Sequence, residues 1–305
     1  MTDPTTTAPV TGAASGAPGE ARILDRGYRH YRGARTGVRG AQRALVAHSV
    51  QRALGMRRTI WAKVLPIATI GIAYVPAIVF VGVVALVPSD ELEANFLPSY
   101  GEYYGFIIAA IMIFVALVAP EVLCTDRRTG MLGVYLSSPL DRDSYLAAKA
   151  AAIVGVLSLV CLGPPLLMLI ANVLQSTGPD GVGDIALTFA RVLVAGSVLT
   201  LLFTGVTMGV ASLTDRKSVA SAGIILLFLV SIMVSGILMD ATDGDGAGVL
   251  SVTVLALDLA ARVQGESSSP LEGASSALVW GAWAAWTVGG FALARYRLHR
   301  LPVTR

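Results

Sequence analysis

The chain has 305 residues, of which 54% are apolar and 14% are charged, and its mean hydropathy is +0.69. Soluble domains carry about 25% charged residues, so this composition excludes an ordinary soluble domain and predicts a membrane protein. The net charge of +3 and the pI near 9.0 do not indicate nucleic-acid binding, because the basic residues flank apolar segments, where anionic lipid headgroups are the natural partners. We therefore expect membrane lipids, and no nucleic acid, among the partners.

The N-terminal region has two parts. Residues 1–21 are rich in Thr, Ala, Gly and Pro and lack apolar periodicity, which predicts a disordered tail rather than a secretory signal. Residues 22–63 are basic, and Val46, Val50 and Leu54 recur every four residues beside arginines. This pattern predicts an interfacial amphipathic helix that leads into the first span. The alternative is a polybasic membrane anchor without regular structure.

Six segments are long and apolar enough to cross the hydrocarbon core of a bilayer, which takes about 20 helical residues. They lie at 64–87, 104–123, 149–174, 186–213, 218–239 and 274–294. The sequence therefore predicts an all-α polytopic membrane protein with six transmembrane helices, a transmembrane domain at 64–294 and a basic tail at 295–305.

A seventh apolar segment, at 249–263, is too short to cross, because as a helix it extends only about 22 Å. We expect it to be a short outer helix before the last span, which dips into the membrane or lies flat on it. Asp258 and Arg262 are four residues apart in this segment and could pair on one helix face, beside the apolar Leu255 and Leu259.

Basic and acidic residues fall on opposite sides of these six spans. All 23 Lys and Arg residues except Arg191 and Arg262 lie on the side of the chain ends. The other side carries twelve acidic residues: Asp90, Glu91, Glu93, Glu102, Asp180, Asp184, Asp240, Asp243, Asp245, Asp258, Glu266 and Glu272. The positive-inside rule then predicts cytoplasmic N and C termini. A seventh span would place the basic tail outside, against this bias.

Few ionisable groups and two cysteines lie within the spans. Glu121 falls near the inner boundary, where it can reach water or brace the segment that follows, and Arg191 falls near the outer boundary. Cys124 and Cys161 lie at the inner end of one span and inside the next, so we expect free thiols.

Small residues and prolines mark two local features of the spans. Gly205 and Gly209 form a GxxxG pattern, which favours close packing of helices, more simply within this chain than across a dimer seam. Pro164 and Pro165 interrupt the hydrogen bonding of the third span and predict a kink there.

The segment 121–149, between the second and third spans, is longer than a simple reversal needs. Its charged, apolar and turn residues follow in the order Asp126, Arg127, Arg128, Gly130, Met131, Leu132, Val134, Tyr135, Leu136, Ser137, Ser138 and Pro139, and Asp141 can then cap the next helix. An exposed apolar patch framed by charges favours a docking surface, with Met131, Leu132 and Leu136 for fit and the charges for orientation. In the alternative interpretation the charges only stop the spans at the headgroup layer.

This order of residues resembles the first cytoplasmic loop of permease subunits in type-2 ATP-binding-cassette exporters. The matching residues are Asp126, Arg127, Gly130, Met131, Leu132, Ser138, Pro139, Leu140, Arg142 and Lys149, although Asp126 stands where Glu is usual and Met131 where Thr is common. The resemblance extends over residues 41–295. It implies that this segment, including Glu121, forms a coupling helix that contacts a separate ATPase. It also implies that the 249–263 segment corresponds to the re-entrant helices near the exit.

No GxxxxGK[ST] phosphate-binding loop occurs, so we expect ATP and Mg²⁺ on a partner subunit and no cofactor bound by this chain. His30, His48 and His299 all lie in the inner flanks, which leaves no intramembrane Ser-His dyad or metal cluster. The sequence therefore predicts no enzyme activity and no metal site.

These observations favour a plasma-membrane permease that forms half of an export pathway, pairs with a second, identical or homologous permease chain, and is driven by cytoplasmic ATP-binding-cassette ATPases. One alternative is a stand-alone carrier, which would need ionisable residues at mid-span or broken helices in repeats. Another is a membrane scaffold that anchors a cytoplasmic enzyme through the same segment.

Overall fold

The computed structural model describes residues 37–56, 60–86, 98–179, 181–242, 244–266 and 269–301, together with Gly33. The chain divides into two units, Met1–Arg35 and Thr36–Arg305, and all elements below belong to the second. The tail expected at 1–21 and the end of the basic C-terminal tail, residues 302–305, lie outside the described residues.

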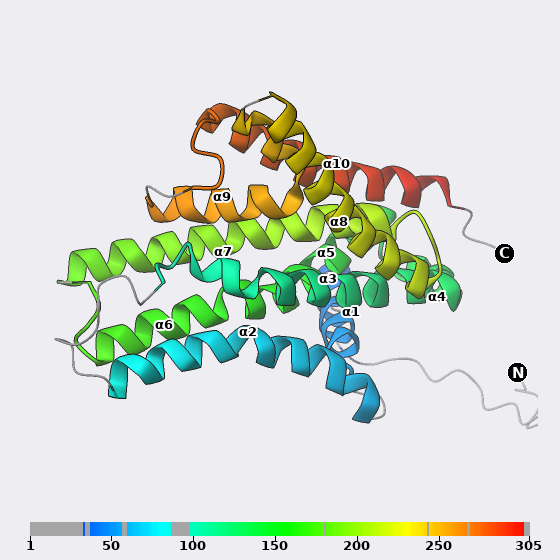
Figure 1. Cartoon of the computed structure of the whole chain (residues 1–305). Helices are drawn as coiled ribbons and strands as arrows, with labels where there is room; N and C mark the ends of the chain where they lie inside the picture. The colour runs from blue at the N-terminus through cyan, green and yellow to red at the C-terminus, as the bar shows by residue number, and fades with distance from the viewer. Residues whose placement is uncertain are drawn as a thin grey trace, which may run out of the picture. The chain divides into compact units, whose positions relative to one another are not determined.

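The described residues are 84% helical and form no strands. The elements are α1 (Gly37–Ala53), α2 (Ile60–Leu86), α3 (Tyr103–Arg128), α4 (Met131–Leu136), α5 (Arg142–Cys161), α6 (Gly163–Leu174), α7 (Val182–Ala211), α8 (Lys217–Thr242), the 3-10 helix η1 (Asp245–Leu250), α9 (Val252–Gln264) and α10 (Ser276–Arg300) (Figure 1). Within these described residues, six stretches are long and apolar enough to span a membrane: α2 from Lys63, α3, α5 with α6, α7, α8 and α10. The prediction of an all-α protein with six spans is confirmed.

The third span is broken at Leu162, where α5 ends and α6 begins. Pro164 and Pro165 occupy the first turn of α6, where a missing N–H group costs least. Pro165 cannot donate to the carbonyl oxygen of Cys161 four residues earlier. The hydroxyl of Tyr104 donates to that oxygen instead, at 2.9 Å. A donor from α3 thus satisfies the carbonyl that the proline leaves free, as an apolar surrounding requires.

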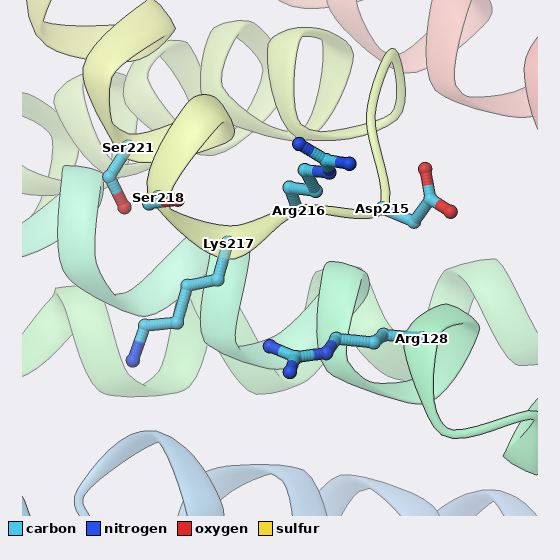
Figure 2. A pocket seen from close by; sticks show the side chains of 6 residues that line it. All are labelled: Arg128, Asp215, Arg216, Lys217, Ser218 and Ser221. Atoms are coloured by element: carbon cyan, nitrogen blue, oxygen red, sulfur yellow. The ribbon is translucent and has the colours of Figure 1, made fainter.

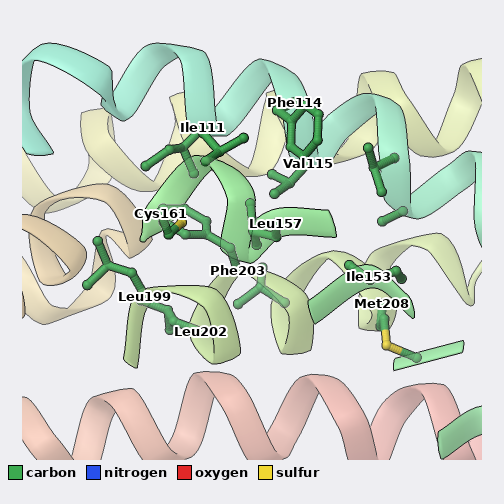
Figure 3. Packing of buried hydrophobic residues seen from close by; sticks show 14 of the residues in the cluster. Ile111, Phe114, Val115, Ile153, Leu157, Cys161, Leu199, Leu202, Phe203 and Met208 are labelled. Carbon is green, nitrogen blue, oxygen red and sulfur yellow. The ribbon is translucent and has the colours of Figure 1, made fainter. Parts of the chain in front are cut away.

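Helices α3, α5 and α7 form the centre of this unit. In α3, 67% of the most apolar stretch is buried, against 22% in α2, 22% in α8 and 17% in α10. Figure 3 shows side chains of the three central helices packed together, with Phe114 from α3, Leu157 from α5 and Phe203 from α7. The outer helices keep one apolar face on this core and leave another exposed, as expected of helices that face lipid.

Helices α7 and α10 approach each other closely at glycines. A Cβ atom at Gly205 would lie 2.6 Å from the carbonyl oxygen of Thr287, and one at Gly209 would lie 3.0 Å from the Cα atom of Gly290. The GxxxG pair therefore packs α7 on α10 within one chain, because only the missing side chains let the two backbones come so near.

The segment η1–α9 enters the bundle beside the spans. The indole Nε1 of Trp286 donates to the carbonyl oxygen of Val249 at 3.2 Å. Trp286 lies ten residues into α10, about 15 Å along its axis. The hydroxyl of Thr253 lies 3.6 Å from the sulfur of Met112, which is at a similar depth in α3. Of the two expectations for this segment, the structure agrees with a helix that dips among the spans rather than one that lies flat.

Helix α1 packs on α5 and α3. Its buried side chains are Leu45, Ser49 and Ala53. The predicted apolar stripe, which begins at Val46, lies one residue further along the helix and is only half-buried. The expected helix before the first span is present, and the alternative without regular structure is wrong for 37–53. Its contact with the other helices, rather than with lipid alone, was not predicted.

Candidate functional site

One end of the bundle gathers α1, α4, the end of α3, the beginning of α5, the α7–α8 connection and the end of α10 (Figure 1). We call it the α4 end. The segment 121–149, expected to be a loop, is mostly helical there, because α3 continues to Arg128 and α5 already begins at Arg142. Gly130 turns the chain between α3 and α4 with φ of 70°, a left-handed conformation that glycine adopts most easily.

Asp141 caps α5 as expected. Its carboxylate accepts a hydrogen bond from the backbone N–H of Ser144 at 2.9 Å, which satisfies one of the free donors in the first turn. The hydrogen bonds from Ser144 also hold the pKa of Asp141 below its usual value. Helices α3 and α5 are the two legs of a hairpin that carries α4 between them. The Asp141 cap therefore fixes the beginning of the second leg.

Asp126 is the centre of a buried ionic cluster. Its carboxylate lies 2.5 Å from Nη1 of Arg52 and 2.6 Å from Nζ of Lys149, and it accepts a hydrogen bond from the hydroxyl of Tyr145 at 3.0 Å. Lys149 also donates to the hydroxyl of Ser49 at 2.9 Å. The side chains of Asp126 and Lys149 are both fully buried, so their charges depend on each other for compensation. The expectation that Asp126 orients a partner at the surface is wrong, because it faces inward and ties α3 to α1 and α5.

Glu121 lies on α3 ahead of Asp126 and connects the same cluster to α8. Its carboxylate lies 2.5 Å from Nζ of Lys217 and 3.4 Å from Nε of Arg52. Arg52 therefore bridges both carboxylates of α3. Glu121 braces α3 against α1 and α8 at the point where α3 leaves the apolar core.

Arg127 also points inward. Its Nη1 donates to the carbonyl oxygens of Ser212 at 2.8 Å and Thr214 at 3.2 Å. These carbonyls follow the end of α7, where no further helical N–H group is available. The expectation that Arg127 belongs to a docking surface is wrong, because its guanidinium fixes α3 to the end of α7.

Arg142 makes the corresponding contact between α5 and α10. Its Nη1 donates to the carbonyl oxygen of Leu298 at 2.9 Å, in the last turn of α10. Beside it, the carboxylate of Asp143 makes two contacts of 2.9 Å with the guanidinium of Arg295. That pair is exposed and adds little stability by itself. Arg142 thus holds the second leg of the hairpin on α10 rather than facing a partner.

Helix α4 has an inner and an outer side. Leu132 on α4 and Leu140 after it are buried, with 8% and 6% of their surfaces exposed, and Leu136 is half-buried against the core. Leu132 was expected to fit into a partner and instead anchors α4 on its own bundle. The outer side carries Met131, 37% exposed, and Val134, 60% exposed.

The exposed residues Met131, Val134, Ser137 and Pro139 form what we call the α4 surface. The first three recur every three residues, which places them on one side of a short helix. Arg128 is also exposed but lies at the end of α3, toward α8. The apolar side chains available to a partner are therefore fewer than the sequence indicated.

At the other site predicted from the sequence, Nε of Arg262 lies 2.6 Å from the carboxylate of Asp258. Asp258 also accepts from the backbone N–H of Leu271 at 3.1 Å, so the pair closes the return from α9 to α10. Leu255 and Leu259 are fully buried in the bundle. The segment is thus held by its own polar contacts and by the core.

The site predicted from the sequence did not include Arg52, Ser49 or Lys217. Arg52 lies one turn after Ser49 and beside Ala53, on the buried side of α1. An arginine placed among small residues on the packed face of an amphipathic helix is a signal that could have found it. The two cysteines, Cys124 and Cys161, are buried free thiols.

Comparison with known proteins places most of the chain in a described family. A family model described as ABC-2 family transporter protein matches residues 24–249. This range contains α1 to α8, and therefore the whole ionic cluster and the α4 surface. The comparison with curated proteins found no match.

Proposed function

The chain belongs to the ABC-2 family of transporter proteins, and from this premise we propose that it is the permease subunit of an exporter driven by a separate ATP-binding-cassette ATPase that docks on the α4 surface. The observation that carries the proposal is α4 itself, a short helix with exposed Met131 and Val134 whose two ends are held by inward-facing ionic contacts. Exposed apolar side chains on a rigid support suit a partner's groove.

The contacts around α4 suggest how movement of an ATPase reaches the spans. Directly before α4, Asp126 and Arg127 bind α1, α5 and the end of α7; directly after it, Arg142 binds the end of α10. Removing one partner of such a buried ion pair costs about 3–5 kcal/mol, so the cluster resists being pulled apart. A push on α4 therefore moves the attached helices together instead of deforming the hairpin.

We propose that the α4 end faces the cytoplasm of a plasma-membrane protein, with both chain ends on that side. The α4 end carries several basic residues, which are Arg127, Arg128, Arg216, Lys217 and Arg295, and the positive-inside rule favours a cytoplasmic position for them. ATP and Mg²⁺ then belong to the docked ATPase, and this chain binds neither.

A second permease chain, identical or homologous, would complete the pathway. Helices α2, α8 and α10 keep large apolar faces that the described part of the chain does not cover. Lipid covers part of such faces in any membrane protein, and a second chain would cover another part. The six spans of one chain then form half of the route, with export as the proposed direction.

The test is capture of the ATPase by the purified membrane protein. The pair Met131→Asp and Val134→Asp places charge on the α4 surface without touching the buried cluster, and should lower ATPase capture and coupled hydrolysis at least about tenfold. Val182→Asp, at a still more exposed apolar position at the beginning of α7, is the control and should capture the ATPase normally.

Three results would contradict the proposal. Undiminished ATPase capture by the variant with Met131→Asp and Val134→Asp would show that the ATPase does not dock on the α4 surface. Transport in cells without any partner ATPase would indicate a stand-alone carrier. Capture of a different cytoplasmic enzyme through α4 would indicate a scaffold.

A further inference from the structure

A cavity of about 640 Å³ lies at the α4 end, between the end of α3 and the connection from α7 to α8. Figure 2 shows its lining residues, which are Arg128, Asp215, Arg216, Lys217, Ser218 and Ser221. The contacts proposed for the α4 surface involve none of them. The cavity is therefore a separate feature of this end of the bundle.

The lining of the cavity is positively charged. Its described residues supply three cations and one carboxylate, and Figure 2 shows the carboxylate of Asp215 directed away from the guanidinium of Arg128. Lys217 contacts Glu121 at 2.5 Å, yet 46% of its side chain stays exposed. Arg128 and Arg216 are exposed, and within the part of the chain that the structure describes neither guanidinium has an ion-pair partner. Two guanidinium groups are thus available for an anion.

Hydroxyl groups add to these charges. Ser218 and Ser221 line the cavity from the first turns of α8. A phosphate group binds best where planar guanidinium groups and hydroxyl donors meet, because each contact is then a charge-assisted hydrogen bond. The chemistry of the lining fits a phosphate monoester or diester.

An apolar strip continues from the cavity along α8. Ser218, Ser221, Ile225, Leu229 and Ile232 follow at spacings of three and four residues, which places them on one side of the helix. The three apolar members are 43%, 56% and 37% exposed. The strip from Ser218 to Ile232 is about 21 Å long, comparable to much of one acyl chain.

We propose that this cavity binds the phosphate group of an anionic phospholipid whose acyl chains lie along the apolar strip of α8. The cavity lies at the beginning of a candidate span, Lys217–Thr242, and lipid headgroups contact a membrane protein at the ends of its spans. A free phosphate uses only the charged part of this arrangement, and an acidic protein surface has no use for the strip. A lipid uses both parts at once.

The experiment measures lipid binding to the purified chain in detergent, without any ATPase, by native mass spectrometry. Dioleoylphosphatidylglycerol and dioleoylphosphatidylcholine are the two probes. The wild-type chain should bind the anionic lipid at least about tenfold more tightly, because only that lipid carries a net charge for the two arginines. Failure of ATPase docking would not affect this measurement, so the two proposals are tested separately.

Variants of the two arginines test the headgroup site. The pair Arg128→Gln and Arg216→Gln should weaken phosphatidylglycerol binding about tenfold and leave phosphatidylcholine unchanged. The pair Arg128→Lys and Arg216→Lys should restore most of the affinity, since lysine still binds phosphate as a point charge. The matched control is Arg297→Gln with Arg300→Gln, which removes the same charge from exposed positions on α10 and should bind like the wild type.

A variant of the strip separates lipid from free phosphate. Ile225→Ser with Leu229→Ser should weaken phosphatidylglycerol binding several-fold. The proposal is overturned if this variant binds normally while inorganic phosphate displaces the lipid, which would make the cavity a free-phosphate site. It is also overturned if the glutamine pair binds phosphatidylglycerol as well as the wild type does. Loss of ATPase capture in the glutamine pair, with lipid binding unchanged, would assign the cavity to an acidic protein surface instead.

Discussion

The Nζ atom of Lys149 lies 2.6 Å from Oδ2 of Asp126, and neither side chain is exposed. The two residues stand on opposite legs of the hairpin that carries α4, one near the end of α3 and one in α5. Because each charge is taken out of water, it needs an opposite charge nearby to compensate for the lost hydration. This ion pair joins α3 to α5 on the buried side of the hairpin. We therefore treat α3, α4 and α5 as one rigid unit at this end.

The first prediction is that loss of the carboxylate in this cluster destabilises the protein more than loss of one of its cations. Asp126→Asn leaves two cations, Lys149 and Arg52, facing a neutral amide, and should destabilise the fold by about 3–5 kcal/mol. Lys149→Met leaves Asp126 its contact with Arg52, and should cost less. Thermal unfolding in detergent measures both effects.

In the double variant, Asp126→Asn with Lys149→Met, the loss should be smaller than the sum of the single losses, by about 0.5–3 kcal/mol, because the two residues contact each other. Strict additivity would show that the two charges do not compensate each other.

Neighbouring arginines give a second prediction. Arg127→Gln removes hydrogen bonds to the carbonyl oxygens of Ser212 and Thr214, and should lower the free energy of unfolding by about 1.5–3 kcal/mol, as for bonds that involve a charged group. Arg128→Gln is the control, since its side chain is exposed, and should stay within about 0.5 kcal/mol of the wild type. Equal effects of the two substitutions would contradict the inward position of Arg127.

Hydropathy located the six spans because the length and apolarity of a span are local properties of the sequence. The direction of a side chain at the end of a span is not local. Asp126 and Arg127 looked alike as boundary charges, yet their partners are Arg52 in α1 and the carbonyls that follow α7. Those partners lie far along the chain, and the local sequence motif does not indicate which residues they are.

The same contrast applies to the remaining features. The break near Pro164 was predictable, since a proline removes its own N–H group. The depth of η1–α9 was not, because it depends on the hydrogen bond from Trp286 to Val249. Leu132 was assigned to a partner because its apolar character alone cannot say whether it packs on its own bundle or on another protein.

The third prediction tests the contact between α7 and α10. Gly205→Ala adds a Cβ atom 2.6 Å from the carbonyl oxygen of Thr287. The helices must then separate, which should cost about 1–3 kcal/mol of stability. Gly289→Ala is the control, because a Cβ atom there meets no neighbouring atom within 4 Å. A Gly205→Ala protein with the melting temperature of the Gly289→Ala protein would disprove the close approach.

The fourth prediction is a pH dependence at the beginning of α5. The pKa of Asp141 is lowered by its hydrogen bonds with Ser144, so the ionised carboxylate stabilises the folded state. That contribution is complete above the ordinary pKa of about 3.9 and disappears as the pH falls through the lowered folded-state value. Asp141→Ala should therefore melt below the wild type at neutral pH, and the difference should shrink in acid. A difference that is constant with pH would rule out the cap.

The last prediction concerns orientation. Ser137 lies on the α4 surface, and Ser176 lies in the connection from α6 to α7 at the opposite end of the bundle; both are exposed. If the α4 end is cytoplasmic, as the gathering of basic residues there favours, a cysteine at position 176 should react with a membrane-impermeant maleimide in intact cells. A cysteine at position 137 should react only after the membrane is opened. The natural Cys124 and Cys161 are buried, so the unsubstituted protein should give little background in either condition. Labelling of position 137 in intact cells, with position 176 protected, would invert the topology and with it the proposed site of ATPase docking.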